Sequence, residues 1–177
     1  MPGKPRIRSI ETIAKSRLFR IEEMHLTFSN GAERVCERMI GDYPNSVIIA
    51  PFLDNETLLM IREYSAAIER YELTLPKGLV DEGEDFLTSA NRELQEEIGY
   101  RAEKLDYICP LTIAPGYINH TSHVIRASEL TPSKLVGDEP EELEVVPCNI
   151  GDIAAIISRE DVTDARTIAT LHLVSNS

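Results

Sequence analysis

Segment 85–98 most restricts what this chain can fold into, because it has the periodicity of an amphipathic helix. Its apolar residues recur at three- and four-residue intervals, at Leu87, Ala90, Leu94 and Ile98. Gly99 follows where helices commonly end. We therefore expect a helix over Asp85 to Ile98 that buries one apolar edge against the rest of the molecule.

The same helix carries three glutamates on a neighbouring face. At about 100° per residue, Glu93, Glu96 and Glu97 fall within about a third of the helix circumference. Like charges this close repel one another unless cations or arginine neutralise them. Mg²⁺ prefers hard oxygen ligands and keeps several waters, so it suits such a cluster when a substrate phosphate completes its shell. Three glutamates are also commonplace on exposed helices, so the triplet alone favours an ordinary solvated face.

The residues around the helix decide between these two interpretations. Residues 78–100 read GLVDEGEDFLTSANRELQEEIGY, which resembles the Nudix box in its spacing of glycine, glutamate and arginine. The matching fixed positions are Gly78, Glu84, Arg92, Glu93, Glu96, Glu97 and Gly99. At average residue frequencies near ~7%, seven such matches arise by chance on the order of once in a hundred million starting positions. The chain is identified as a member of the Nudix hydrolase family, and the acidic cluster as functional.

Membership of this family implies a fold and a set of site roles. The expected fold is α/β, a Nudix α/β/α sandwich with a mixed sheet, plus an N-terminal β-strand extension. By position, the resemblance assigns metal binding to Glu93, Glu96, Glu97 and a backbone carbonyl near Gly78. Arg92 is expected to orient a carboxylate, Glu84 to support the site, and Glu96 to take part in catalysis. The implied reaction is attack of water on a diphosphate phosphorus, helped by Mg²⁺, or by Mn²⁺ or another divalent cation.

Strand-like segments surround the helix. Asn30-Gly31 is typical of a hairpin turn between strands 19–28 and 35–40, and Asp54-Asn55 indicates another between 46–53 and 57–64. Further strands are expected at 71–75, 104–113, 122–127 and 143–146, and helices at 150–158 and 164–174. We expect two regions, an N-terminal β-strand region for dimerisation over 1–44 and a Nudix hydrolase domain over 45–177.

Features outside the box resemble Nudix enzymes that act on ADP-linked substrates. Pro115 lies fifteen residues beyond the box, and the strand pair before the box is similar to that of ADP-ribose pyrophosphatases. The acidic loop, residues 137–142, resembles the loop that supplies a catalytic glutamate in these enzymes. Glu141 is its best positional match and Glu139 the next. Turns with Pro-Gly and solvated acidic loops are the ordinary alternatives.

The entry into the box narrows the resemblance further. Residues 72–78 read ELTLPKG, two residues longer than the Glu-Leu-Pro-Ala-Gly entry common in ADP-ribose pyrophosphatases. This entry and the acidic loop are more similar to bacterial ADP compounds hydrolases, and the likeness extends through residues 11–19 and 28–31. It implies magnesium-dependent hydrolysis of the diphosphate linkage in ADP-ribose, NADH and diadenosine polyphosphates, with release of AMP.

The same resemblance implies a homodimer built by the N-terminal strands, with adenine held near the subunit boundary. Arg17, Phe19 and Arg62 are candidate substrate contacts, because an aromatic face can stack on a base and arginine can stack or pair with phosphate. Pro115 is a fourth candidate from its position. Core packing for Phe19 and surface salt bridges for the arginines are the alternatives.

Composition limits the partners and the compartment. A net charge of −12 argues against binding a nucleic-acid polymer through a basic surface. Three well-separated cysteines suit a reducing compartment better than a disulfide framework or zinc site. Residues 1–10 lack the apolar stretch of a secretory signal, and the longest apolar run, 47–53, is too short to span a bilayer. We expect a soluble cytoplasmic protein that acts on small ADP-containing molecules and binds no membrane.

Alternative functions remain open at this point. The nearest is an ADP-ribose-specific pyrophosphatase, and a more distant one is a hydrolase of inosine, diphosphoinositol or cap-like substrates. A non-catalytic Nudix module that binds a nucleotide and regulates a partner would retain the fold without turnover. A purely structural acidic domain would show no cation-dependent ligand binding.

Overall fold

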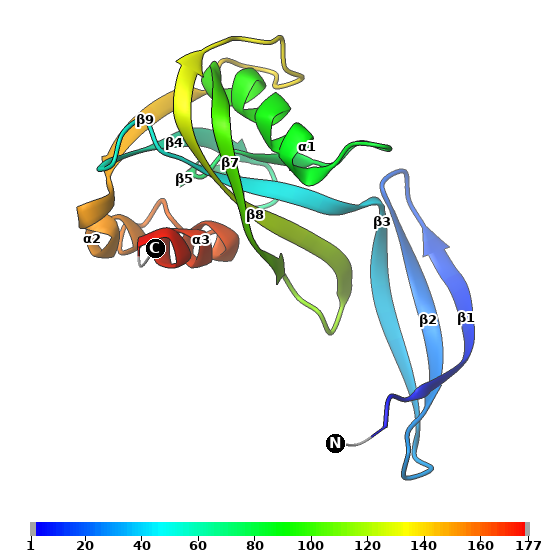
Figure 1. Ribbon diagram of the computed structural model, residues 1–177. Helices are drawn as coiled ribbons and strands as arrows, with labels where there is room; N and C mark the ends of the chain where they lie inside the picture. Colours follow the sequence, from blue (N-terminus) through cyan, green and yellow to red (C-terminus); the bar gives the residue numbers. More distant parts are fainter. Residues whose placement is uncertain (1–2, 176–177) are drawn as a thin grey trace. The chain divides into compact units, whose positions relative to one another are not determined.

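The computed structural model describes residues 3–175, which form two compact units: residues 3–44 with 112–121, and residues 45–111 with 122–175. In chain order (Figure 1), the elements are β1 (Arg6–Lys15), β2 (Phe19–Thr27), β3 (Glu33–Pro51), β4 (Thr57–Ser65), β5 (Arg70–Thr74), β6 (Lys77–Leu79), α1 (Phe86–Glu93), η1 (Leu94–Ile98), β7 (Tyr100–Thr112), β8 (Ile118–Pro132), β9 (Glu144–Asn149), η2 (Ile150–Asp152), α2 (Ile153–Ile157) and α3 (Ala165–Ser175).

The first unit is built on an antiparallel sheet of β1, β2 and the first part of β3. The predicted turn at Asn30-Gly31 is present between β2 and β3. Gly31 has a φ of +82°, which glycine adopts without steric cost, and the Asn30 side-chain oxygen accepts a hydrogen bond from the Ala32 amide at 3.0 Å. This turn fixes the register in which Thr27 faces Glu33.

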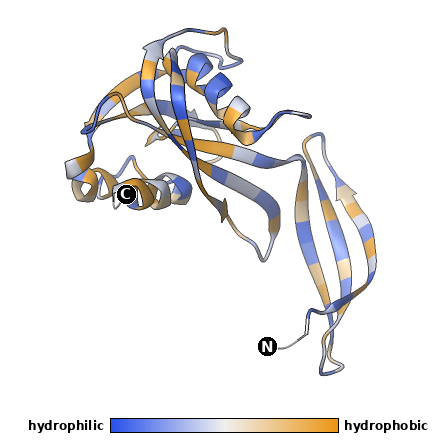
Figure 2. Cartoon of the chain, viewed as in Figure 1, coloured by the Kyte–Doolittle hydropathy of each residue, from blue (hydrophilic) through white to orange (hydrophobic). Residues whose placement is uncertain are grey.

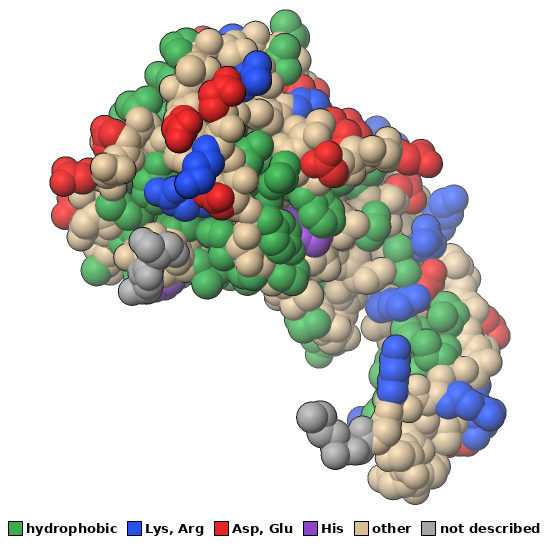
Figure 3. Space-filling model, viewed as in Figure 1, with side chains coloured by type: hydrophobic (Ala, Val, Ile, Leu, Met, Phe, Trp, Pro, Cys, Tyr) green, Lys and Arg blue, Asp and Glu red, His purple; other side chains and the backbone are tan. Residues whose placement is uncertain are grey.

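Apolar side chains stay exposed on the first unit, and Figure 3 shows hydrophobic atoms at the surface of its strands. Each of the following is at least 37% exposed: Ile7, Ile10, Ile13, Leu18, Phe19, Phe28 and Val35. Among the described residues of this unit, only Glu22 and Ile40 are buried. The unit therefore has little core of its own.

One long strand replaces two predicted ones. The sequence predicted strands at 35–40 and 46–53, separated by the polar stretch after Ile40, but β3 runs without a break from Glu33 to Pro51. Its first part pairs with β2, and Ser46, Val47 and Ile48 pair with β6. Pairing on both parts keeps the polar residues between them extended, so the predicted break is wrong.

The turn of the second predicted hairpin is present, but its two strands do not stay paired beyond the first bridge. Asp54 accepts hydrogen bonds from the amides of Glu56 and Thr57, and Phe52 and Leu58 form an isolated bridge. After that bridge, β4 leaves β3 and becomes the middle strand of a separate sheet ordered β5-β4-β9. The other sheet follows the order β1-β2-β3-β8-β7, with β6 paired to β3.

Strand periodicity in the second unit builds two cores. Alternate residues of β3 and β4 enter opposite clusters, since successive side chains of a strand point to opposite faces. One cluster takes Ile48, Ala50, Leu58 and Met60 together with Leu171 and Val174 of α3. The other takes Val47, Ile49, Leu59 and Ile61 together with Ala90 and Leu94 of the helix after β6. Figure 2 shows the apolar stretch of β3 that serves both.

Helices thus cover both faces of the strands in this unit, with α1 on one side and α2 and α3 on the other (Figure 1). Within residues 3–175, no helix has the length and apolar character needed to cross a membrane.

Candidate active site

The helix that carries the glutamates begins where its sequence predicts. Asp85 caps α1, and its carboxylate accepts hydrogen bonds from the amides of Leu87 and Thr88, both at 2.9 Å. Gly99 ends the helix in the left-handed region, with a φ of +74°.

The last turn differs from the predicted regular helix. Residues Leu94–Ile98 form a π-helical turn, closed by a hydrogen bond from the Gly99 amide to the Leu94 carbonyl. Apolar residues four apart fit either kind of turn, so the sequence pattern did not distinguish them. Such turns are frequent at functional sites, and this one widens the backbone where Glu96 and Glu97 project.

Several polar contacts hold the helix in place. The Asn91 side chain donates to the Ala102 carbonyl at 3.0 Å and accepts from the Ala102 amide at 2.9 Å, which joins α1 to β7. At the start of the helix, the ring of Phe86 stacks on His123 of β8 with centroids 3.6 Å apart. The helix that carries the glutamates is therefore attached to β7 and β8.

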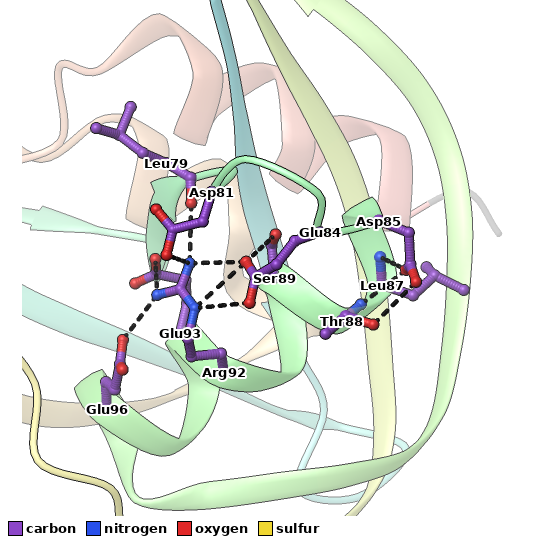
Figure 4. Close-up of polar contacts among 10 residues, drawn as sticks. All are labelled: Leu79, Asp81, Glu84, Asp85, Leu87, Thr88, Ser89, Arg92, Glu93 and Glu96. Atoms are coloured by element: carbon purple, nitrogen blue, oxygen red, sulfur yellow. Dashed lines mark hydrogen bonds and ion pairs between the residues drawn. The ribbon is translucent and has the colours of Figure 1, made fainter. Parts of the chain in front are cut away.

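Arg92 gathers the box residues around one guanidinium group (Figure 4). Its Nη1 donates to Glu93 at 2.7 Å and to Glu96 at 3.0 Å. Its Nε and Nη2 donate to Glu84, each at 3.2 Å, and Nη2 also donates to the Leu79 carbonyl at 3.0 Å. A rigid fork with five N–H donors suits this role better than a lysine would. Arg92 therefore contacts Glu93 and Glu96, and its expected role in orienting a carboxylate stays a prediction.

Glu84 lies at the other end of this network. It accepts a hydrogen bond of 2.6 Å from the Ser89 hydroxyl in addition to those from Arg92. The hydrogen bonds from Arg92, followed by that from Ser89, hold the pKa of Glu84 below its usual value, so it stays ionised. Burial opposes the charge on Arg92, but Glu84 and Glu93 outweigh it and raise the arginine's pKa.

The two most buried glutamates of the box differ from Glu84 in the direction of their pKa shifts. Glu93 is 9% exposed and Glu97 is 5% exposed. Burial raises the pKa of Glu93 to about 7, although the charge of Arg92 opposes the shift. Burial also raises the pKa of Glu97 well above its usual value, with Lys77 opposing and Glu93 adding repulsion. A positive charge placed beside them would favour their ionised forms.

Strand β6 packs its backbone directly on these carboxylates. The Lys77 amide donates to Glu97 Oε2 at 3.0 Å. A Cβ atom added to Gly78 would lie 1.9 Å from Glu93 Cδ, so only glycine leaves room there. The side chain of Lys77 forms an ion pair with Glu63 of β4. The box glycine is thus explained by close approach.

The acidic loop is docked beside the same turn. Lys134 Nζ donates to the Glu96 carbonyl at 3.0 Å, and the Leu135 amide donates to the Gln95 carbonyl at 3.1 Å. A cavity of about 410 Å³ lies between the loop and the helix, lined by Glu96, Glu139 and Glu141 among others. Both catalytic candidates of the loop therefore border the cavity that Glu96 borders.

The donor atoms suit a hard divalent cation, since Glu93, Glu96 and Glu97 offer carboxylate oxygens from one turn. As they stand, no three acidic, histidine or cysteine side chains within residues 3–175 are grouped closely enough to hold a metal ion. Arg92 Nη1 occupies oxygens of both Glu93 and Glu96. The residue types fit a cation, and binding it requires these side chains to turn from the arginine.

Two family models match the chain. The NUDIX domain model matches residues 42–169, and the NudE-type Nudix hydrolase N-terminal domain model matches residues 5–38. This chain belongs to the Nudix hydrolase family. The box predicted from the sequence lies within the first match.

Relatives of this Nudix hydrolase span nearly its whole length. It is 42% identical over 171 residues to the ADP compounds hydrolase NudE of Escherichia coli (strain K12), covering 97% of this chain and 91% of the relative. It is 31% identical over 172 residues to an ADP-ribose pyrophosphatase of Bacillus subtilis (strain 168), covering 91% of each.

A crystal structure of an ADP compounds hydrolase matches with a TM-score of 0.91 at 40% identity, covering 98% of this chain and 94% of that chain. This match confirms the predicted Nudix fold.

The other site candidates of the Nudix hydrolase are Arg62 in the second unit and Arg17, Phe19 and Pro115 in the first. Arg62 of β4 donates to Glu144 at 3.0 Å and to Asp161 at 2.9 Å, so its guanidinium joins β4 to β9 and to the segment before α3. Arg17 and Phe19 lie in the first unit and are exposed. Pro115 lies in the same unit, in the turn between β7 and β8, where the Tyr117 amide donates to the Ala114 carbonyl.

Two polar pairs of the site were not found from the sequence. They are the ion pair of Lys77 with Glu63 and the hydrogen bond of 2.7 Å from the Tyr71 hydroxyl to Glu141. Both join residues of different strands or loops, so no local spacing marks them. The sequence singled out one member of each pair, Lys77 through the Lys77-Gly78 entry and Glu141 through the acidic loop, but neither partner.

Proposed function

We propose that this Nudix hydrolase is a pyrophosphatase that requires a divalent cation, Mg²⁺ in the first place, and splits the diphosphate linkage of ADP compounds with release of AMP. The observation that carries the proposal is the Arg92 network, which holds Glu84, Glu93 and Glu96 beside the buried Glu97. The similarity to the E. coli ADP compounds hydrolase over 97% of the chain supports the substrate class.

The cation would be held by Glu93, Glu96, Glu97 and the backbone at Gly78. When bound, it activates a water and neutralises negative charge on the phosphates. Arg92 remains fixed when Nη1 releases a carboxylate, because its other nitrogens donate to Glu84 and Leu79. The arginine therefore keeps its own position, and its contact with Glu84, in either state.

A proton must leave the attacking water, and the acidic loop offers the acceptor. Glu139 and Glu141 both border the cavity next to Glu96. Burial and then the charges of Glu63 and Asp138 raise the pKa of Glu139. A carboxylate with a raised pKa accepts a proton more readily. Glu139 Oε or Glu141 Oε is thus the proposed site that takes the proton.

The exposed apolar residues of the first unit support a homodimer. A unit whose strands and turns expose this many large hydrophobic side chains is typical of a surface that a partner covers. We propose that a second copy of this chain does so, and that Arg17, Phe19 and Pro115 contribute to substrate binding from this unit. Arg62 is bound to two carboxylates, which favours a structural role for it.

The proposed substrates are ADP-ribose, NADH and diadenosine polyphosphates, and the proposed location is the cytoplasm, in keeping with three free thiols. An ADP-ribose-specific pyrophosphatase is the second candidate, supported by the similarity to the B. subtilis enzyme.

Product analysis separates these candidates. ADP-ribose, NADH and diadenosine triphosphate are offered separately with Mg²⁺, with Glu97→Gln as the control. AMP from several substrates, absent with Glu97→Gln, supports the broader function. AMP from ADP-ribose alone favours the narrow one. Ligand binding without any turnover would contradict both and indicate a non-catalytic Nudix module.

A further inference from the structure

The acidic loop is held firmly at its N-terminal side. Leu135 and Lys134 donate to carbonyl groups of the π-helical turn, and the Ser133 hydroxyl donates to Gln95 Oε1 at 2.9 Å. A Cβ atom at Gly137 would lie 3.2 Å from Glu96 Cβ, so the loop begins in close contact with a proposed metal ligand. The start of the loop is therefore fixed to the helix.

The far side of the loop is tied to a different element. The Tyr71 hydroxyl on β5 donates to Glu141 Oε1 at 2.7 Å. The tyrosine is itself placed by its strand pairing with Tyr64 and by an edge-to-face contact of the two rings, with centroids 5.3 Å apart. The charge and hydrogen bond of Glu141 raise the pKa of Tyr71, so the phenol stays a donor at neutral pH.

This hydrogen bond separates the two glutamates of the loop. Glu141 is directed to β5, where its carboxylate is occupied by the phenol. Glu139 instead lies near Glu63 and Lys77, whose charges act on it, and the Lys77 amide contacts Glu97. Both carboxylates border the cavity beside Glu96, but Glu141 is the one that the phenol holds, which leaves Glu139 as the loop carboxylate to act at the glutamate cluster.

We propose that Tyr71 is a positioning residue, whose hydroxyl holds Glu141 at β5 and so sets the acidic loop with Glu139 toward the glutamate cluster. This inference rests on the proposed role of the acidic loop as the proton acceptor. In it, Glu141 anchors the loop and Glu139 accepts the proton.

The anchor itself is tested without turnover. In protein labelled with ¹³C at the tyrosine Cζ, the signal of Tyr71 is assigned with Tyr71→Phe and followed through an alkaline titration. We expect Tyr71 to titrate above ordinary tyrosine, and Glu141→Ala to move its midpoint to lower pH. Glu142→Gln, one residue further along the same loop, should leave it unchanged. A Tyr71 midpoint that ignores Glu141→Ala overturns the proposal.

Turnover then tests what the anchor does. Loss of one hydrogen bond contributes a factor of about three to ten, so Tyr71→Phe and Glu141→Ala should each lower kcat by about that factor with little change in KM. Their double variant should fall no further, because both remove the same contact. Glu141→Gln keeps an acceptor oxygen and should stay within about twofold of the parent. Tyr64→Phe is the matched control.

The contrast with Glu139 completes the test. Glu139→Gln should lose at least about a hundredfold in kcat, as expected for a general base. Two results would overturn the proposal. One is a double variant in which the kcat losses of Tyr71→Phe and Glu141→Ala multiply, and the other is a larger kcat loss for Glu141→Gln than for Glu139→Gln. If Glu141→Ala lowers the titration midpoint of Tyr71 but every loop variant keeps full turnover, the proposed role of the loop in catalysis is wrong. The hydrogen bond would then exist without affecting catalysis.

Discussion

The backbone of Gly78 lies against the carboxyl group of Glu93, so closely that a Cβ atom there would sit 1.9 Å from Glu93 Cδ. This contact joins the first residue of the box to the helix that carries the glutamates. It places a backbone strand, rather than a side chain, beside the proposed cation site. The contact also makes the site sensitive to a single methyl group.

Gly78→Ala should therefore displace Glu93 from its position. We expect kcat/KM for ADP-ribose to fall at least about tenfold, since a displacement near 1 Å in a catalytic site costs about that much or more. Gly41→Ala is the matched control, because a Cβ there meets its nearest neighbours at an ordinary 3.9 Å. Parental activity in Gly78→Ala would show that Glu93 can adopt another position that supports catalysis equally well.

The buried glutamates should give the metal-free protein a distinctive pH dependence. Burial raises the pKa of Glu93 from 4.5 to about 7, so between these values the folded protein binds more protons than the unfolded chain. The free energy of unfolding should then decrease as the pH rises from about 4.5 to 7, by about 3 kcal/mol at most from this residue.

Urea unfolding in a chelator at several pH values measures this slope. Glu93→Gln should reduce this slope, because the amide does not titrate, and the part that comes from the raised pKa of Glu97 should remain. Carboxyl groups with a lowered pKa, such as Glu84, give the opposite trend, but only below pH 4.5. There the free energy of unfolding decreases as the pH falls, because these groups become protonated. Equal slopes for the parent and Glu93→Gln would be evidence against the raised pKa.

Lys77 should act as the resident positive charge of the site when no cation is bound. Lys77→Met removes the ion-pair partner of Glu63 and the positive charge that acts on Glu97. Both of these carboxylates are largely buried. We expect the metal-free variant to lose about 1–3 kcal/mol of stability, and Mg²⁺ to raise its melting temperature more than that of the parent. Calorimetry with and without Mg²⁺ measures both effects.

Lys104→Met controls for loss of a lysine charge, since its pair with Asp106 is about half exposed at 3.7 Å. It should change neither quantity appreciably. An equal response to Mg²⁺ in the parent and Lys77→Met would remove Lys77 from the electrostatics of the site.

Arg92→Lys should cost far more than a conservative change normally does. A lysine provides a single nitrogen, so it cannot reach Glu84, Glu93 and Glu96 together as the guanidinium does. We expect kcat to fall at least about tenfold, with a smaller effect on KM, in steady-state assays. Arg101→Lys, at a surface pair with Glu103, should have parental kinetics. Similar kinetics for both variants would leave Arg92 without an orienting role.

Much of the site could be predicted because its residues are close in the sequence. The spacing of Glu93, Glu96 and Glu97 and the stop at Gly99 are local properties of one helix, and the structure keeps them together. The π-helical turn could not be predicted, because Leu94 and Ile98 fit both kinds of helix.

Longer-range features were hidden for a related reason. Strand β3 continues through polar residues because it pairs on both of its parts, which is a tertiary effect. The Tyr71–Glu141 and Lys77–Glu63 contacts join residues 70 and 14 positions apart. Neither contact leaves a mark in composition or periodicity.

In the proposed function, the glutamates of one helical turn bind the cation that this enzyme needs to split ADP compounds. This role is tested most directly by measuring AMP release from ADP-ribose and Mn²⁺ binding by electron paramagnetic resonance, in the parent and in Glu97→Gln. We expect Glu97→Gln to stay folded, to bind Mn²⁺ at least about tenfold more weakly and to lose most of its turnover, because the cluster loses one charge. Parental Mn²⁺ affinity and near-parental kcat in Glu97→Gln would contradict it.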